Sequence, residues 1–350
     1  MKYLRHLSLF LFSFVLLNQV ASAQAGGAAV PFLLIAPDAR AAGMGEAGTA
    51  IADNVNAVYW NPGGMGFMEN QRQISLSFSR WLPQFNADLY YSYGTYGEYF
   101  SELNGMVAVN FILMNLGEFT RTSENGTVLG KFRSNEFSIG LSYGTLIADN
   151  LGAGVQVRYI RSNLSPITSG GAGAGAGTSL SFDLSTLWKP TFLDDRFSFG
   201  VNLQNIGPKV TYIREADPLP TNLRVGTAVQ LVNDEFNDLK IAVDVSKLLV
   251  KRDSLGSDPL PTSLVTAWQT PGAEFSIGAE YWYAQAVALR AGFFSEPSRI
   301  GGRQFLTFGA GVQYNMFQLD FSFINTIEQN HPLANTMRFS MLINFDKMTN

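Results

Sequence analysis

The sequence has 350 residues, of which 46% are hydrophobic and only 15% are charged, with 24 basic and 28 acidic side chains and no cysteine. The lack of cysteine excludes disulfide bonds, thiolate metal sites and a lipid-accepting cysteine at a cleavage point. The weakly acidic balance gives no indication of nucleic-acid binding. Beyond the N-terminal segment, no stretch approaches the roughly 18 continuous apolar residues of a membrane-spanning helix, which argues against a helical inner-membrane protein.

Residues 1–23 have the pattern of a signal peptide. Lys2 and Arg5 precede an apolar run over residues 7–17, and Ala21-Ser22-Ala23 has the small residues of a signal-peptidase site. The alternative, a transmembrane anchor, needs roughly 20 apolar residues, and this run is shorter. We therefore expect an exported protein whose mature chain begins near Gln24.

Residues 24–70 are rich in Ala and Gly and show little alternation of apolar and polar side chains. Asp38 is placed to cap a short helix that continues to Met44, and the sequence over residues 61–64, Asn-Pro-Gly-Gly, predicts a turn. We expect this segment to form a plug inside a barrel or across its periplasmic mouth. A periplasmic amphipathic arm is the alternative.

Residues 71–350 repeat one pattern, in which apolar side chains occupy every second position over stretches of about ten residues closed by Gly, Asn, Asp or Pro. Phe317, Leu319, Phe321 and Phe323 form one clear example. Counting such stretches predicts an all-β fold, a transmembrane antiparallel β-barrel of about 14 strands in a bacterial outer membrane. Residues 94–104 make a longer turn than such a barrel needs, which leaves the count open by two strands.

Charged side chains test this interpretation, because a charge facing lipid near the bilayer midplane costs about 2–4 kcal/mol, whereas one facing the lumen need not. Arg80, beside Trp81 at a strand end, is an exception that can reach the interface. Other strand charges fall on the face opposite the apolar set; they are Glu136, Arg158, Asp183, Arg196, Arg224, Lys240, Asp244, Glu274, Glu280, Arg290, Asp320 and Arg338. We predict a polar network in the lumen formed by Arg158, Asp183, Arg224, Lys240, Asp244, Glu280, Arg290, Asp320 and Arg338.

A soluble β-sandwich also shows alternating apolar and polar residues and is the alternative fold. The lengths of the connections between strands distinguish the two. If both termini are periplasmic, the connections on the opposite, extracellular side are the longer ones. The short connections lie at residues 148–150, 284–285 and 315–316. The long ones are 116–134, 162–177, 205–219, 248–272, 295–303 and 325–333.

The sequence contains few of the residues that catalytic sites commonly use. Its only histidines are His6, in the signal peptide, and His331, in the last long loop, so neither a Ser/His/Asp triad nor a histidine metal site is indicated. The Gly/Ala run over residues 169–177 lacks the Lys-Ser/Thr of a phosphate-binding loop. We expect no catalytic residue, no metal and no cofactor.

Several segments together resemble the PorV family of type IX secretion system barrels, which is related to the long-chain fatty-acid transporters. The N-terminal one is ARAAGMGEAGTAIADNVNAVYWNPGGMGF, residues 39–67. The sister family PorQ has similar features and is the closest alternative. The C-terminal matching segments are GVNLQNIGPKVTYI (200–213), LPTNLRVG (219–226), DVSK (244–247), LRAGFFSE (289–296) and HPLANTMRFSM (331–341).

The resemblance implies a non-enzymatic protein that binds the C-terminal signal domain of exported cargo at the cell surface. Its implied partners are the translocon barrel, which hands over cargo, and an attachment complex with a sortase-like protein, which joins cargo to lipopolysaccharide. Uptake of hydrophobic small molecules and enzymatic modification of lipopolysaccharide are the competing hypotheses. Apolar residues in the long loops are candidates for cargo or partner contacts, although they can equally cap strands or rest on lipid; they are Tyr212, Ile213, Leu248, Leu249, Val250, Leu255 and Leu260.

Overall fold

The structure is a computed structural model, which describes residues 27–85, 88–123, 125–165, 175–191, 196–212, 215–253, 256–298 and 300–348. The expected signal peptide, Ile213 and Leu255 lie outside the described residues.

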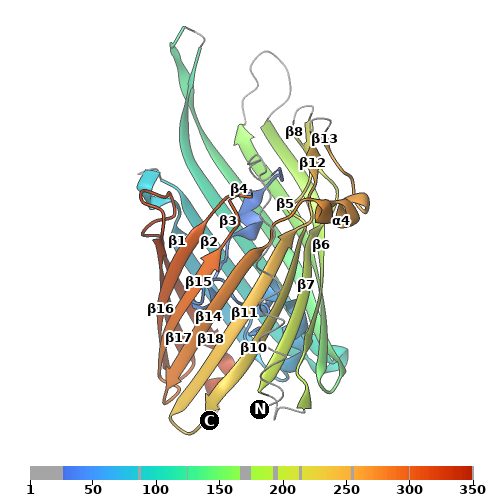
Figure 1. Ribbon diagram of the computed structural model, residues 1–350, viewed down its shortest axis with the longest axis vertical. Helices are drawn as coiled ribbons and strands as arrows, with labels where there is room; N and C mark the ends of the chain where they lie inside the picture. Colours follow the sequence, from blue (N-terminus) through green and yellow to red (C-terminus); the bar gives the residue numbers. More distant parts are fainter. Residues whose placement is uncertain are drawn as a thin grey trace.

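Fourteen strands of the described chain close into an antiparallel barrel, which confirms the predicted fold class and strand number (Figure 1). Each strand pairs with its neighbours along the chain, and β1 closes the barrel against β18, with Phe78 opposite Phe339. The barrel strands are β1 (Arg72–Arg80), β2 (Tyr90–Phe100), β3 (Gly105–Thr122), β4 (Val128–Ala148), β5 (Leu151–Ser165), β6 (Gly175–Trp188), β7 (Phe197–Ile206), β10 (Asn222–Asn233), β11 (Asn237–Leu248), β14 (Glu274–Tyr283), β15 (Val287–Ser295), β16 (Gln304–Tyr314), β17 (Phe317–Thr326) and β18 (Met337–Asn344).

Burial alternates along these strands with the predicted period of two. On β18, Met337 and Phe339 are exposed on the outer face, whereas the alternating residues Arg338 and Ser340 are buried. The outer face is therefore apolar and the inner face polar, as lipid outside and a packed lumen inside require.

The connections at one end of the barrel are tight turns, and those at the other end are longer; we call these the short-turn end and the long-loop end. The turn between β2 and β3 is only η4 (Ser101–Leu103) and Asn104, so the expected long turn at 94–104 was wrong: β2 continues to Phe100. Residues 116–134 are likewise mostly strand, because β3 and β4 continue beyond the barrel as a two-stranded hairpin (Figure 1).

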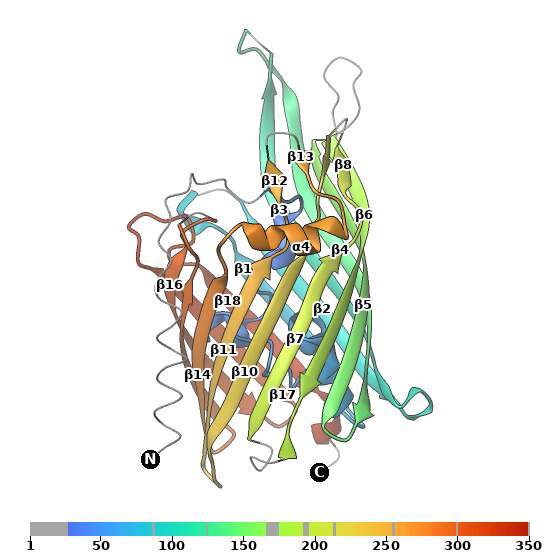
Figure 2. The same cartoon turned by 45° about the vertical axis from the view of Figure 1, so that its right-hand side comes forward.

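Several long loops contain structure of their own. A two-stranded hairpin, β8 (Val210–Tyr212) and β9 (Glu215–Asp217), follows β7. The connection from β11 to β14 contains the hairpin of β12 (Arg252–Asp253) and β13 (Gly256–Ser257), then α4 (Thr262–Thr266) and η6 (Ala267–Gln269). Figure 2 shows α4 lying across the outside of the barrel wall near the long-loop end. The connection between β1 and β2 contains η3 (Pro83–Phe85).

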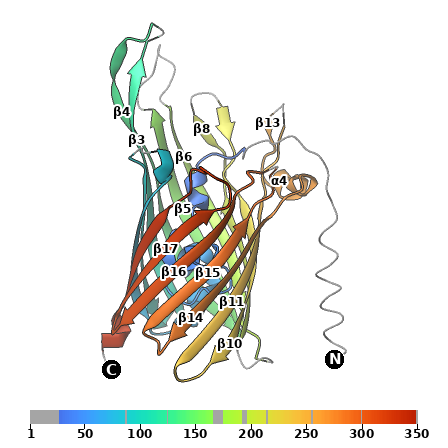
Figure 3. The ribbon, with the colours of Figure 1, turned by 60° about the vertical axis from the view of Figure 1, so that its left-hand side comes forward.

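Residues 27–70, which we call the plug, pass through the lumen (Figure 3). They begin at the long-loop end, where the Ala29 amide donates to the Pro218 carbonyl (2.8 Å), and continue through η1 (Pro31–Leu34), α2 (Ala39–Ala42), α3 (Ala57–Trp60) and η2 (Pro62–Phe67). The C-terminal turn η7 (Phe345–Met348) lies at the opposite, short-turn end. The described part of the chain thus starts at the long-loop end and ends at the short-turn end.

Local sequence explains the turns of the plug. The Asp38 carboxylate caps α2 by accepting a hydrogen bond from the Ala41 amide (2.9 Å), as predicted, and its second oxygen accepts one from the Trp60 indole (2.6 Å). Glycines on the wall allow η2 to press against it: a Cβ on Gly154 would lie 2.2 Å from the Pro62 carbonyl carbon. Backbone therefore packs directly on backbone at this contact.

Candidate functional site

Apolar plug residues fill the lumen between the plug and the wall. Met44, Val55 and Met65 are fully buried and form one cluster with Met106 of β3 and Leu187 of β6. Such a cluster is as closely packed as a protein interior. At this level the lumen is a core and contains plug side chains in place of a water-filled channel.

Buried ion pairs connect the plug to the wall. Arg40 of α2 donates to Glu280 of β14 through Nε (2.8 Å) and Nη2 (2.7 Å), and it also pairs with Asp53 of the plug. Glu280 in turn accepts from Arg290 Nε (2.7 Å), and Arg290 Nη1 donates to Asp320 (2.8 Å). Two guanidinium groups and three carboxylates therefore form one chain that crosses from the plug to β17.

A second ion pair lies in the wall. Arg158 of β5 pairs with Asp183 of β6, and both side chains are fully buried. The other oxygen of Asp183 accepts from the Asn205 amide (2.8 Å), where β7 has a left-handed residue and its pairing with β6 shifts register. This pair thus supports an irregular part of the wall.

Two further predicted lumen residues hold the plug by other means. The Asp244 carboxylate on β11 accepts hydrogen bonds from the amides of Gly48 (3.0 Å) and Thr49 (2.9 Å). Lys240 lies on the same face of β11, four residues before Asp244 and closer to the short-turn end, and its ammonium is 3.4 Å from Asp53. The residues predicted as one network are therefore several separate groups, and most of them bind the plug.

Sequence reasoning missed Arg40 and Asp53, which complete these groups. A signal was present, because Arg40 stands alone in an Ala-rich segment that was expected inside a barrel. A buried arginine usually pairs with a carboxylate. The alternation used for the strands does not extend into the plug, so it could not assign that partner.

Arg224 and Arg338, the remaining members of the predicted network, lie against aromatic rings. The Arg224 guanidinium is 5.1 Å from the Trp60 ring centre and donates Nε to Gln204 (3.1 Å). The Arg338 guanidinium is 5.6 Å from the Trp81 ring centre, and its closest carboxylate is Glu46, 4.0 Å away. These two arginines carry buried charge without a close ion pair among the described residues.

A cavity of about 480 Å³ lies above the plug at the long-loop end. One side is apolar and includes Trp81 and Phe305, while Lys247 and Arg303 contribute cationic groups. Its volume falls within the range of about 300–1,000 Å³ typical of small-ligand pockets. The remaining lining residues are Gly27, Pro31, Leu34, Ile35, Glu46, Asn222, Ser246, Leu248, Val250, Arg252, Thr270, Pro271, Gly272, Glu274, Glu296, Ile300, Gly301, Ile324 and Leu333.

The predicted loop contacts do not form one exposed patch. Leu248 and Val250 line the 480 Å³ cavity, and Leu249, Val250 and Leu260 line a second pocket of about 410 Å³ between the loops after β7 and β11. Leu249 is buried. Tyr212 packs against an apolar cluster that includes the first plug residues, and burial raises the pKa of its hydroxyl. These side chains mainly hold the loops on each other.

Apolar residues other than those predicted from the sequence are exposed at the long-loop end. Val265 in α4 is 73% exposed and Trp268 in η6 is 57% exposed. Phe119, Val128 and Leu129 are exposed on the hairpin that extends from β3 and β4. An exposed Trp and Val on a short helix outside the barrel rim can contact either lipid or a partner protein.

Every helix in the described part of the chain is too short or too polar to cross a bilayer. The described residues also contain no group of three or more His, Cys, Asp or Glu side chains placed to hold a metal ion. His331 accepts a hydrogen bond from the Leu333 amide through Nδ1 (3.1 Å), which is a structural role.

Comparison with known families matches residues 18–254 to the model described as type IX secretion system protein PorV. The chain belongs to the PorV family. The match covers the plug and more than half of the barrel, and it confirms the resemblance found in the sequence. This PorV-family barrel is accordingly an outer-membrane component of the type IX secretion system.

Solved structures similar to the PorV-family barrel share its fold at low sequence identity. The Pseudomonas putida toluene transporter TodX gives a TM-score of 0.55 at 13% identity, covering 93% of this chain and 99% of that one. The Ralstonia pickettii toluene transporter TbuX gives 0.54 at 14% identity, covering 88% and 97%. A Pseudomonas aeruginosa FadL homologue gives 0.54 at 13% identity, covering 89% and 98%. The search of curated proteins found no match.

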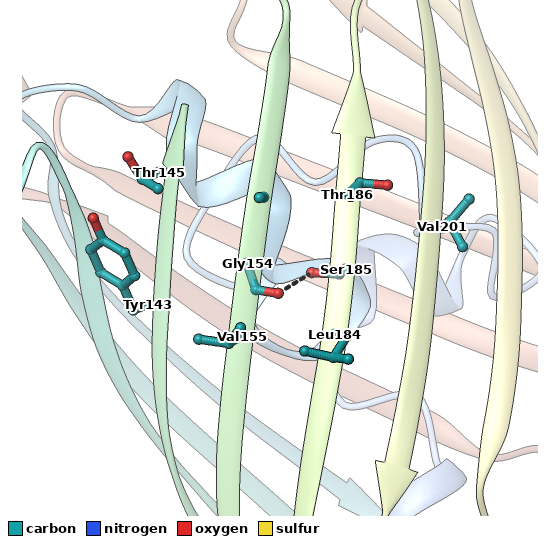
Figure 4. Close-up of a pocket in the computed structure, with 9 residues that line it drawn as sticks. Tyr143, Thr145, Gly154, Val155, Leu184, Ser185, Thr186 and Val201 are labelled. Carbon is teal, nitrogen blue, oxygen red and sulfur yellow. Dashed lines mark hydrogen bonds between the residues drawn. The ribbon is translucent and has the colours of Figure 1, made fainter. Parts of the chain in front are cut away.

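The outer wall of the PorV-family barrel has a shallow groove of about 400 Å³ across β4 to β7 (Figure 4). Tyr143, Val155, Leu184 and Val201 surround it, and the small side chain of Thr186 leaves it open. The groove lies on the apolar face of the barrel, on the other side of the wall from η2. Its position and lining fit lipid acyl chains.

Proposed function

We propose that this protein is a non-enzymatic carrier of the type IX secretion system. It binds the C-terminal signal domain of exported cargo at the cell surface, receives that cargo from the translocon barrel, and passes it to the attachment complex with the sortase-like protein. In this proposal the long-loop end faces the cell exterior and the C-terminal turn η7 faces the periplasm.

The occluded lumen is the observation that favours a carrier over a pore. The plug fills the barrel with buried apolar side chains, and Arg40, Glu280 and Asp244 fasten it to the wall through ion pairs and hydrogen bonds. A protein cannot pass through a lumen packed in this way. Cargo is therefore expected to contact the outside of the molecule, and membership of the PorV family supports a role in type IX secretion.

The long-loop end offers a suitable binding surface. The β3–β4 hairpin, the β8–β9 hairpin and α4 are ordered elements mounted on a rigid barrel, and rigidly mounted loops are common binding sites. Val265 and Trp268 expose apolar area there. The apolar residues predicted from the sequence, Tyr212 and Leu249 among them, support these loops from beneath.

A deletion strain tests the proposal. Without the protein, cargo is expected to accumulate in the periplasm with its C-terminal signal domain uncleaved, and the wild-type gene is expected to restore secretion. Native co-purification from the outer membrane should recover the translocon barrel and the attachment complex. Normal cargo secretion by the deletion strain would refute the proposal.

A second candidate is uptake of hydrophobic small molecules, favoured by the 480 Å³ cavity and by the fold shared with the toluene transporters. It predicts that the deletion strain takes up labelled toluene or a long-chain fatty acid more slowly than wild type. It also predicts detergent or lipid in the cavity of the purified protein. Equal uptake rates in the two strains would exclude this candidate.

A further inference from the structure

The outer face of β3, β4 and β5 changes from apolar to polar at one level near the long-loop end. Phe137 of β4 and Arg161 of β5 are directly opposite each other, and both point outward, since Ser138 and Ile160 beside them face the lumen and are buried. Arg161 is thus a charged side chain at the edge of the apolar outer face of β4 and β5. Toward the short-turn end this face exposes Ile139, Leu141, Tyr159, Val157 and Val155.

The position of Arg161 matches the upper edge of a hydrocarbon layer. β5 begins at Leu151, at the short-turn end, and the chain from there to Arg161 extends roughly 33 Å at about 3.3 Å per residue. With a strand tilt of about 40°, this length gives a height of about 25 Å, which is the usual height of the apolar band of an outer-membrane barrel. An arginine at this edge reaches the lipid headgroups at little cost.

Cations outnumber carboxylates on this part of the outer face. The Arg161 guanidinium makes neither an ion pair nor a hydrogen bond within the described part of the chain. Arg133 follows farther along the outer face of β4, and its Nε is 4.0 Å from Glu118 Oε2. Glu118 pairs more closely with Lys131, at 2.7 Å. Three cations therefore face one carboxylate, so the surface attracts anions.

A row of asparagines lies directly above the apolar band, between the levels of the two arginines. Asn115 of β3 is opposite Asn135 of β4, and Asn135 is opposite Asn163 of β5. Asn115 donates to the Asp88 carbonyl (2.8 Å), whereas the side-chain amides of Asn135 and Asn163 make no hydrogen bond to another described residue. Each free amide offers two donors and an acceptor, which suit the hydroxyl and amide groups of a sugar.

A phosphorylated glycolipid uses all of these features. Arginine binds phosphate oxygens in a two-pronged geometry, the amides bind sugar, and the aromatic and aliphatic side chains below contact acyl chains. A glycerophospholipid has one phosphate and a small headgroup, so it would leave Arg133 and the amide row unused. Free phosphate would leave the apolar side chains uncovered.

We propose that the outer face of β3, β4 and β5 at the long-loop end binds a phosphorylated glycolipid of the outer leaflet. Arg161 holds one phosphate and Arg133 a second. Asn135 and Asn163 bind the sugar between them, and the acyl chains lie along the apolar band beside Tyr159. This site goes beyond the carrier function, but it rests on the orientation proposed with that function, in which the long-loop end faces the cell exterior.

Lipid binding to the purified full-length barrel in dodecyl maltoside tests the site. The probes are diphosphoryl lipid A, the same lipid A with both phosphates removed, and phosphatidylglycerol. Native mass spectrometry over a lipid titration should show diphosphoryl lipid A binding at least about 10-fold more tightly than either of the other two. Equal affinity for the phosphorylated and dephosphorylated forms would overturn the inference, and so would equal or tighter binding of phosphatidylglycerol.

Variants with opposite expected effects guard against a folding artefact. Arg161→Gln should weaken binding of diphosphoryl lipid A about 10-fold, and Glu118→Gln should strengthen it by removing the competing carboxylate. Arg80→Gln removes an outward cation at the end of β1, opposite Tyr90 and away from the asparagine row, and should leave the affinity unchanged. Equal losses in Arg161→Gln and Arg80→Gln would show general attraction to anionic lipid and overturn the site.

Labelling of intact cells separates the glycolipid site from the orientation on which it rests. The chain has no cysteine, so Thr120→Cys on the β3–β4 hairpin gives one thiol for a membrane-impermeant maleimide. Labelling is expected if the hairpin is outside the cell. If the thiol is not labelled, both the orientation and the site fail. If it is labelled and the barrel does not prefer diphosphoryl lipid A, the orientation stands and the glycolipid site alone is wrong.

Discussion

Arg40 of the plug and Glu280 of β14 form a two-pronged buried ion pair, with nitrogen to oxygen distances of 2.8 and 2.7 Å. The two residues are 240 positions apart in the chain. Glu280 also accepts a hydrogen bond from Arg290, so one carboxylate holds the plug to the wall and two neighbouring strands to each other. This pair is one of several contacts that hold the plug in the lumen.

Glu280→Gln should destabilise the barrel by about 3 kcal/mol, because it leaves two buried guanidiniums with one fewer carboxylate between them. Urea unfolding of the refolded protein in detergent micelles measures the change. Glu118→Gln, on the exposed hairpin beside Lys131, is the matched control and should leave stability close to that of wild type.

The double variant Arg40→Gln/Glu280→Gln sharpens this test. The two residues contact each other, so the combined loss should be smaller than the sum of the two single losses. Strictly additive losses would show that the two side chains do not interact in solution.

Gly154→Ala should loosen the plug from the wall. The added methyl would lie 2.2 Å from the Pro62 carbonyl carbon and 2.4 Å from the Gly63 amide nitrogen, so backbone must move, at a cost of about 1–3 kcal/mol. Limited proteolysis of the plug and urea unfolding both report the effect.

Gly94→Ala is the control for that substitution. Its methyl would lie 3.3 Å from the end of the flexible Leu76 side chain, which can move aside. Equal protease sensitivity of the Gly94 and Gly154 variants would refute the tight plug contact.

The barrel was predictable from the sequence because lipid and lumen make opposite demands on successive residues. Phe339 and Arg338 are neighbours in sequence and lie on opposite faces of the wall. The pattern of period two therefore predicts both the strands and the face on which each side chain lies. The pattern weakens beyond the bilayer, where both faces of the β3–β4 hairpin are exposed to solvent. For this reason the sequence predicts a loop over residues 116–134, where the structure has a hairpin.

The candidate site was less predictable. The inward direction of Arg338 and Glu280 followed from strand parity, but their partners come from the plug and from distant loops. Leu249 and Val265 are both apolar loop residues in sequence, yet one is buried and the other is largely exposed. Only the packing of the loops on each other separates these two cases.

The turn between β10 and β11 should depend on pH through Asp234. Its carboxylate accepts hydrogen bonds from the Asn237 side chain (2.9 Å) and from the amides of Phe236 (3.0 Å) and Asn237 (2.8 Å), which lower the pKa of Asp234. A lowered folded pKa means that this stabilisation is complete above the unfolded pKa of about 4 and is lost as the pH falls through the folded value.

Asp234→Ala should therefore unfold more readily than wild type at pH 7, and the difference should shrink below about pH 4. The mobility shift of heated samples on denaturing gels gives the unfolding midpoint at each pH. Glu235→Ala removes the same charge from the same turn and should behave like wild type throughout. A gap between Asp234→Ala and wild type that does not change with pH would contradict the assigned role of the carboxylate.

The exposed apolar pair of the α4 region should matter for partner binding and not for folding. Val265→Ser/Trp268→Ser changes side chains that are 73% and 57% exposed, so barrel stability should stay within about 0.5 kcal/mol of wild type. Co-purification of the translocon barrel should fall several-fold, and cargo secretion should slow with it. Ile147→Ser, which changes a similarly exposed residue near the β4–β5 turn at the short-turn end, should affect neither. Unchanged co-purification in the double variant would assign Val265 and Trp268 to lipid contact and move the search for the partner surface to the β3–β4 hairpin.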